Sequence, residues 1–183
     1  MTREQIRPDP GPALLALYDE ALPQVFGYLL ARCGRRALAE DLTSETFLAA
    51  ATACHRTPPP VLSTGWLIGV ARHKLVDHWR AAEREERGLH AVDDSAPPDP
   101  WDEAHLDALL ARQVLGALSG AHRAALTLRY LDGLPVRDVA RTLGRTEHAA
   151  EALLARARAA FRRTYDRRTY DRRTQDREGG RDA

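Results

Sequence analysis

Residues that favour helices dominate almost the whole chain, and this feature constrains the fold more than any other. Alanine, leucine and arginine are abundant, whereas valine, isoleucine, threonine and aromatic residues almost never alternate with polar ones. Ala, Leu and Arg are among the best helix formers, and strict alternation is the pattern of a half-buried strand. Prolines and glycines interrupt the helical stretches. The sequence therefore predicts an all-α protein.

These interruptions divide the 183 residues into two helical blocks, which we expect to form two small domains. The first block covers residues 12–87 and the second covers residues 101–165. Between them, residues 88–100 include three prolines, three aspartates and a glycine, which favour a flexible solvated linker, with a packed loop as the alternative. Residues 166–183 continue a short polar repeat, YDRRT, that cannot bury a core, so we expect the last helix to fray there into a disordered tail.

Composition excludes several classes of protein. Apolar residues make up 44% of the chain and charged residues 29%, which is typical of soluble globular proteins. No apolar run approaches the roughly 18 residues that span a bilayer. The first residues, MTREQIRPDPGP, lack the apolar core of a signal peptide. We therefore expect no membrane insertion and a cytoplasmic location.

The cysteines and histidines form no familiar catalytic pattern. Cys33 and Cys54 are too far apart for a CxxC pair, and a metal site that they share with His55 is the alternative to two structural thiols. The seven histidines occur without an HExxH motif, and the chain has no GxSxG elbow and no Gly-rich phosphate loop. We expect a protein that is not an enzyme and that holds no cofactor and no metal.

The second block has turn and capping residues at the positions that a helix-turn-helix requires. Gly133 supplies a left-handed stop after one helix, and Pro135 is suited to the first turn of the next. Gly144 then permits a tight turn, and Thr146 can cap a long helix that starts at Glu147. A short helix, a glycine turn and a capped long helix are typical of the unit whose second helix enters the DNA major groove.

Apolar residues recur at helical spacing along this unit and predict its buried side. They are Ala124, Ala125, Leu128 and Leu131, then Val136, Val139, Ala140 and Leu143, then Ala150, Leu153, Leu154, Ala157 and Phe161. The opposite face of the long helix is mostly alanine, which lets a backbone approach DNA closely, while arginines beside it reach phosphates. His148 and Glu151 are suited to read base edges; an ordinary surface helix is the alternative. The predicted DNA-binding residues are Arg137, Arg145, Thr146, Glu147, His148, Glu151, Ala152, Arg156 and Arg162.

The stretch EDLTSETF, in the first block, places two carboxylates and a leucine on one helix face. Asp41 and Glu45 are four residues apart, where like charges repel, and Leu48 follows on the same side. Such a face suits a basic and partly apolar partner, whereas a merely solvated acidic face is the alternative. Ser44 lies on this face as well, and Phe47 is expected in the core.

The stretch GWLIGVARHKLVDHWR predicts a second helix with one buried and one cationic side. Its expected buried stripe is Leu67, Ile68, Ala71, Leu75 and Trp79. Its other side presents Arg72, His73, Lys74, Asp77 and Arg80, and Arg84 follows one turn later. Several cations along one helix suit the backbone of separated DNA strands.

The stretches LAEDLTSETFLAAA (residues 38–51) and GWLIGVARHKLVDHWR (residues 65–80) resemble the two core motifs of sigma-70-family factors, and most closely the extracytoplasmic-function (ECF) group. The helix-turn-helix block resembles the domain of the same family that reads the promoter −35 element. In order and spacing, the resemblance covers roughly residues 14–163. It implies a factor that directs core RNA polymerase to promoters and helps to melt them.

The resemblance also implies partners for each surface. The face formed by Asp41, Glu45 and Leu48 would hold the β′ clamp helices of polymerase, with Ser44 where relatives often have Gln. A second polymerase contact would be the β flap. The −10 element would engage the cationic helix and the loop before it, including Arg56 and Ser63. Promoter DNA and an anti-sigma factor complete the expected partners.

Two departures from the family pattern concern the DNA surfaces. His73 stands where relatives usually carry Asn, and residues 149–153 read Ala-Ala-Glu-Ala-Leu where many relatives have a Thr-Val-Lys-Ser-Arg-like run. We therefore expect a different base preference. The alternative function is a helix-turn-helix regulator that never docks on polymerase, and such a protein would need neither the acidic face nor the cationic helix.

Overall fold

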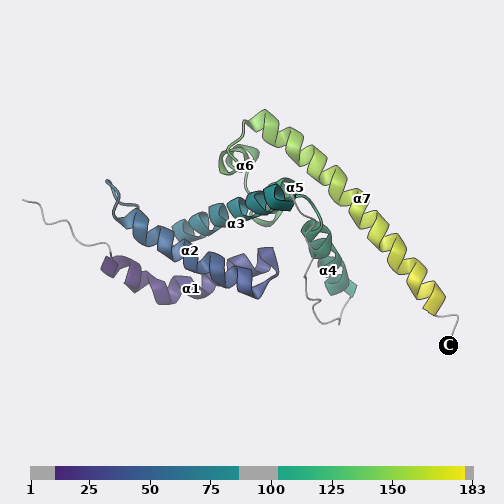
Figure 1. Ribbon diagram of the computed structural model, residues 1–183, viewed down its shortest axis with the longest axis horizontal. Coiled ribbons are helices and arrows are strands. Elements are labelled where there is room, and N and C mark those ends of the chain that lie inside the picture. Colours follow the sequence, from purple (N-terminus) through teal and green to yellow (C-terminus); the bar gives the residue numbers. More distant parts are fainter. Residues whose placement is uncertain (1–10, 87–102, 180–183) are drawn as a thin grey trace, which may run out of the picture. The chain divides into compact units, whose positions relative to one another are not determined.

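The computed structural model describes residues 11–86 and 103–179, and all regular structure in these ranges is helical (Figure 1). The chain divides into two compact units between Asp77 and His78, inside the third helix. The first unit contains α1 (Gly11–Cys33), α2 (Arg36–Cys54) and the beginning of α3 (Thr64–Glu86). The second contains the end of α3, α4 (Glu103–Gly116), α5 (Gly120–Leu126), the π-helical segment η1 (Thr127–Leu131), α6 (Val136–Thr142) and α7 (Glu147–Gly179). The all-α prediction is confirmed.

Helical spacing of apolar residues builds the core of the first unit. In α1, Ala21, Val25 and Leu29 are fully buried on successive turns. The helix α2 packs against α1 and, with α3, supplies further core residues, which include Ala39, Leu42, Phe47, Ala50, Leu67, Ala71 and Leu75. The predicted stripe of α3 is confirmed, except that Ile68 is only half-buried.

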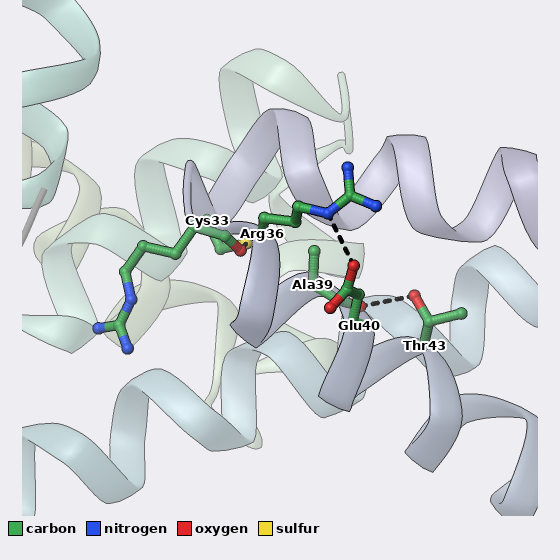
Figure 2. A network of polar contacts seen from close by, with 6 residues as sticks. Cys33, Arg36, Ala39, Glu40 and Thr43 are labelled. Carbon is green, nitrogen blue, oxygen red and sulfur yellow. Dashed lines mark hydrogen bonds and ion pairs between the residues drawn. The ribbon is translucent and has the colours of Figure 1, made fainter. Parts of the chain in front are cut away.

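Two threonine hydroxyls on α2 are buried, and both are hydrogen-bonded within the helix. Thr43 donates to the carbonyl oxygen of Ala39, and Thr46 donates to that of Leu42, both at 2.6 Å. Figure 2 shows the first of these bonds. Because each hydroxyl is satisfied by its own helix, the two side chains can lie in an apolar core without an unpaired polar group.

The predicted glycine turns and the predicted N-cap of the helix-turn-helix are confirmed, whereas Pro135 stands at the N-cap of α6 and not in its first turn. Gly133 and Gly144 have φ angles of +68° and +60°, a region that residues with a Cβ rarely adopt. Pro135 immediately precedes α6. The hydroxyl of Thr146 accepts a hydrogen bond from the backbone N–H of Ala149 at 3.2 Å, which is the geometry of an N-cap.

The buried side of the second unit agrees with the predicted stripe, with one correction. Leu128, Val139, Ala150 and the other predicted residues of α5–α7 are buried or half-buried, whereas Leu131 is 53% exposed. Leu131 ends the π-helical segment, in which the N–H of Asp132 bonds to the carbonyl of Thr127, five residues earlier. The wider turn changes the 3.6-residue spacing on which the prediction depended, and Leu131 leaves the buried side.

The long helix α7 continues to Gly179, well beyond the helix end expected near residue 165. The sequence offers a physical reason, because its arginines and aspartates alternate at favourable helical spacing. Arg162 and Asp166 stand four residues apart, as do Arg167 and Asp171, and opposite charges at this spacing support a helix. The expectation of disorder from residue 166 is thus corrected for residues 166–179, while residues 180–183 and the expected linker lie outside the described residues.

Candidate protein and nucleic-acid interfaces

The predicted docking residues of α2 share one exposed face. Asp41, Ser44, Glu45 and Leu48 are all exposed, and Leu48 shows 70% of its surface. Phe47, one position away, is buried as expected, and its ring lies 4.8 Å from that of Tyr18. A large apolar side chain beside two carboxylates is therefore presented to solvent. We call these four residues the docking face; its partner remains a prediction.

Two members of the docking face already have intramolecular contacts. The Ser44 hydroxyl donates to the carbonyl oxygen of Glu40, at 3.1 Å, so it is engaged with its own helix. The Glu45 carboxylate forms an ion pair with Lys74 of α3, with 3.1 Å between Oε2 and Nζ. Lys74 was predicted as a DNA-binding residue, so this ion pair joins the two predicted surfaces of the first unit.

A groove of about 360 Å³ lies next to the docking face, between α1 and α2. Its lining includes Leu22 and Phe26 from α1 and Ser44 from α2. An ion pair between Arg36 Nε and Glu40 Oε1, at 2.8 Å, belongs to the same lining (Figure 2). This groove was not predicted from the sequence. Its apolar residues in α1, Leu22 and Phe26, are four residues apart, and this spacing is also typical of residues in a buried core.

The cationic side of α3 is exposed as expected. His73, Asp77, Arg80 and Arg84 are exposed at successive turns, and Arg72 and Lys74 beside them are half-buried. Trp79 is 4% exposed and belongs to the core, as expected, and Trp66 is half-buried. The predicted cations therefore form a continuous strip along the helix.

The loop between α2 and α3 holds the two remaining predicted residues of the first unit. Arg56 is exposed. The Ser63 hydroxyl accepts from the backbone N–H of Trp66, at 3.1 Å, and so caps α3. Val61, which the prediction did not include, is 87% exposed. The apolar pair Val61-Leu62, directly after a run of three prolines, is the sequence signal that would have identified it.

All nine predicted DNA-binding residues of the helix-turn-helix are exposed. The turn before α7 carries Arg145 and Thr146, and the first turns of α7 carry His148, Glu151 and Ala152. Spacings of three and four residues bring these last three side chains onto one face. The beginning of α7 therefore presents a reading surface with little side-chain bulk.

Arg162 is placed differently from the other eight. Arg162 lies about 21 Å from His148 along α7, because each helical residue contributes a rise of 1.5 Å. It lines an apolar groove of about 290 Å³ whose other residues are Leu115, Leu126, Tyr130, Leu131, Arg158 and Phe161. Tyr130 and Leu131 are more than half exposed there, and Arg158 donates to the Tyr130 hydroxyl at 3.4 Å. The structure thus brings Arg162 together with an apolar surface and not with the reading face.

Arg156 lies between these two regions, about one turn beyond Ala152, the last of the reading residues. Burial lowers the pKa of His122 on α5; Glu83 opposes this shift, and the positive charges of Arg156 and Arg163 add to it. Arg156 therefore contributes to a positive potential on this side of α7. That potential suits the phosphate backbone of DNA.

We predict that Arg156→Ala weakens binding to duplex DNA by a similar factor for every sequence and lowers the salt slope by about one unit. The reason is that the variant loses one contact between a cationic side chain and a phosphate, while the contacts to bases remain. Fluorescence anisotropy at several salt concentrations measures both quantities, with Arg158→Ala as a control on the groove side of the same helix. An effect limited to one base position would assign Arg156 to base reading.

Comparison with known proteins matches both halves of the chain to one family. Residues 17–85 match Sigma-70 region 2, and residues 108–161 match Sigma-70, region 4. Over 158 residues the chain is 35% identical to the ECF RNA polymerase sigma factor SigL of Mycobacterium tuberculosis, which covers 81% of this chain and 86% of SigL. The chain belongs to the sigma-70 family, in its ECF group. Both matches lie inside the predicted blocks, and Arg162 falls one residue beyond the second.

One further relative agrees with this assignment, and one solved structure shares the fold. The chain is 33% identical over 147 residues to the ECF RNA polymerase sigma factor BldN of Streptomyces coelicolor, which covers 77% of this chain but only 56% of BldN. The chain thus spans little more than half of that relative. The sigma factor RpoE of Bartonella quintana, solved with the anti-sigma factor NepR, has the same fold, with a TM-score of 0.58, 20% identity, and coverage of 84% of this chain and 97% of that one.

The described residues of this ECF sigma factor include neither a membrane-spanning helix nor a cluster of metal ligands. Within residues 11–86 and 103–179, none of the helices combines the length and the apolar character that crossing a membrane requires. Across the same two ranges, His, Cys, Asp and Glu form no group of three that could hold a metal ion. Cys33 and Cys54 are both buried and stand outside any disulfide bond.

Proposed function

We propose that this sigma factor directs core RNA polymerase to specific promoters in the cytoplasm and aids their melting at the start of transcription. The relatives at 33% and 35% identity are ECF RNA polymerase sigma factors, which supports this function over a regulator that never docks on polymerase. The observation that carries the proposal is the exposed docking face of α2 in the same chain as a helix-turn-helix. The chain acts by binding, and the polymerisation chemistry belongs to the core enzyme.

The docking face is proposed to bind the β′ clamp helices of polymerase. Asp41 and Glu45 place two negative charges one turn apart, and a basic partner relieves their mutual repulsion. Leu48, 70% exposed, offers the apolar contact at the centre of such a site. The combination suits a helix with arginine or lysine around an apolar position.

The cationic strip of α3 is proposed to hold the separated strands of the −10 element. The positive charge comes from Arg80 and Arg84, which are exposed, and from Arg72 and Lys74, which are half-buried. A row of cations along one helix suits an extended phosphate backbone. The preceding loop is proposed to receive a base that leaves the stack as the duplex opens. The exposed side chain of Val61 offers this base an apolar contact.

The beginning of α7 is proposed to enter the major groove of the −35 element. The small side chain of Ala152 allows a close approach, and Glu151 can accept a hydrogen bond from cytosine N4. Arg145 and Arg156 lie beside the reading face and are proposed to contact phosphates.

The apolar groove of the second unit is proposed to receive the β flap. Its floor is apolar, and Arg158 and Arg162 stand beside it, so it suits an amphipathic segment with acidic residues. The RpoE structure contains an anti-sigma factor, and we propose that an anti-sigma partner of this chain would compete for the same polymerase-binding surfaces.

Run-off transcription tests the proposed function. Purified chain is mixed with sigma-free core polymerase and a library of promoter fragments, and the 5′ ends of the transcripts are sequenced. We expect start sites that share one pair of −35 and −10 elements. If a known sigma factor activates the same core preparation and this chain yields no accurate start sites, the proposal is wrong.

We predict that His148→Ala or Glu151→Ala relaxes base preference within the −35 element, at a cost of about 1–3 kcal/mol for the preferred base. The physical reason is the loss of a hydrogen bond to a base edge while phosphate contacts remain. Sequencing of selected promoter libraries measures the preference. An unchanged profile in both variants would place the reading residues elsewhere.

A further inference from the structure

We propose that the far part of α7 binds the phosphate backbone of the duplex beside the −35 element, through Arg163 and Arg167. This inference rests on the proposed function, because it takes the beginning of α7 as the part that enters the major groove. Both arginines lie beyond the match to Sigma-70, region 4, which ends at residue 161. The contact would therefore be an addition of this chain to the family module.

The length of α7 carries it well past the groove that its first turns enter. The helix is unbroken from Glu147 to Gly179 (Figure 1), and its 33 residues measure about 50 Å at a rise of 1.5 Å per residue. The major groove of B-DNA is about 12 Å wide. A helix that crosses this width uses about eight residues, so α7 reaches the edge of the groove near Arg156. The residues beyond Arg156 face the neighbouring backbone.

Three arginines form a row along one side of α7. Arg163 follows Arg156 by seven residues, and Arg167 follows Arg163 by four, and both spacings keep side chains on one helix face. All three side chains are exposed. The row extends about 16.5 Å beyond Arg156, which is itself proposed to contact a phosphate. We call Arg156, Arg163 and Arg167 the arginine row.

The electrostatics of the second unit support this alignment. Burial lowers the pKa of His122 on α5, and the positive charges of Arg156 and Arg163 add to this shift, while Glu83 opposes it. Two arginines that stand two turns apart on α7 therefore act on the same residue of α5, as expected for side chains in one row.

The charge of this part of the chain suits a polyanion. Residues 162–179 contain seven arginines and four acidic residues, a net charge of +3, whereas the whole chain has a net charge of +1. Asp166 also lies on the exposed side of the helix, but the arginine row outnumbers it. The row continues from the face that is proposed to read the −35 element, which favours DNA over an acidic protein as the partner.

Contact at Arg167 requires the duplex to bend toward α7, because the surface of a straight duplex curves away from a straight helix. Bending costs free energy, and the additional phosphate contacts offset this cost. Pyrimidine–purine steps such as TA and CA bend easily, whereas A-tracts are stiff. We therefore expect flexible steps beside the −35 element to favour binding by the parent chain.

The test compares the full-length parent with an Arg163→Gln, Arg167→Gln variant, each assembled with core polymerase on closed promoter DNA. Loss of two phosphate contacts should lower the slope of log affinity against log salt by about two units. At one salt concentration, the affinity should fall by about three- to tenfold, because the contacts are exposed. Hydroxyl-radical footprinting should show backbone beside the −35 element that the parent protects and the variant leaves open.

Neutral DNA linkages test the contact from the other side. Methylphosphonates at the backbone positions that the footprint identifies should weaken binding by the parent and leave binding by the Arg163→Gln, Arg167→Gln variant unchanged. Parent and variant on native and neutral backbone form a double-mutant cycle, which measures the interaction between the arginines and these phosphates.

Two further chains separate this contact from net charge and from helix structure. An Arg112→Gln, Arg168→Gln variant loses the same charge from exposed Arg112 on α4 and from Arg168, which is half-buried on another side of α7, and it should match the parent. An Arg163→Lys, Arg167→Lys variant keeps both charges and should retain most of the affinity and the footprint, since lysine also binds phosphate.

The inference is overturned if the Arg163→Gln, Arg167→Gln variant keeps the salt slope and the footprint of the parent, or if the Arg112→Gln, Arg168→Gln variant loses as much. Weaker binding to core polymerase with an unchanged DNA footprint would also overturn it, and would show that the two arginines face a protein. If the parent itself starts no accurate transcription, the proposed function fails as well. Accurate transcription by the parent, with no difference between parent and variant, would overturn this inference alone.

Discussion

Reversing both carboxylates of the docking face, Asp41→Arg with Glu45→Arg, is expected to abolish co-purification with core polymerase and to leave the helical circular dichroism spectrum unchanged. Both side chains are exposed on α2, so the fold does not depend on them. Like charges placed against a basic partner cost several kcal/mol, which corresponds to a loss of affinity of about 100-fold or more. Size-exclusion chromatography with core polymerase measures the complex.

A matched control uses two other acidic residues of the first unit. Asp19 and Glu20 of α1 are also exposed, and reversing both changes the net charge by the same amount. This control should still form the complex. Undiminished binding by the Asp41→Arg, Glu45→Arg variant would show that polymerase contacts a different surface. Loss of binding in both variants would point to overall charge instead of the docking face.

The second large effect concerns stability. Leu67→Ala is expected to destabilise the first unit by about 2–5 kcal/mol, because it removes a fully buried side chain and leaves a cavity. Leu48→Ala, the same substitution at a position that is 70% exposed, should change the free energy of unfolding by less than about 0.5 kcal/mol. Urea denaturation, monitored through hydrogen exchange of the backbone amides in α1–α3, measures the free energy of unfolding of each variant.

For polymerase binding, the order of the two effects is expected to be reversed, so that Leu48→Ala has the larger effect and Leu67→Ala the smaller. Leu48→Ala should weaken the complex, because an apolar anchor of the docking face is lost. Under conditions in which Leu67→Ala remains folded, its binding should match that of the parent. Equal destabilisation by both substitutions would mean that Leu48 packs against the protein itself.

The spacing of apolar and charged residues predicted much of the fold. Where a prediction from this spacing was wrong, the reason lies in a few neighbouring residues. Helical spacing correctly separated Phe47, in the core, from Leu48, on the surface. The same spacing misplaced Leu131, because one π-helical turn shifts the register and no residue type in that turn signals it. It also ended the last helix too early, since the polar repeat was read as unable to bury a core. Opposite charges that stand four residues apart stabilise a helix by a few tenths of a kcal/mol per pair, and this contribution requires no buried core.

By itself the sequence determined the elements whose chemistry is local. Gly133 and Gly144 permit the left-handed turns, Thr146 caps the long helix, and the spacing of Asp41 and Glu45 defines one face. Each of these depends on residues within about one helical turn of one another.

Only the tertiary structure decided which distant side chains meet. It paired Glu45 with Lys74 across two helices, and it placed Arg162 beside the exposed Tyr130 and Leu131, in an apolar groove and away from the reading face. Such contacts depend on how helices pack, and packing is set by the sum of many weak apolar interactions spread over the whole unit. No short stretch of sequence contains that sum, so the docking face could be predicted from its residues and the ion pair between Glu45 and Lys74 could not.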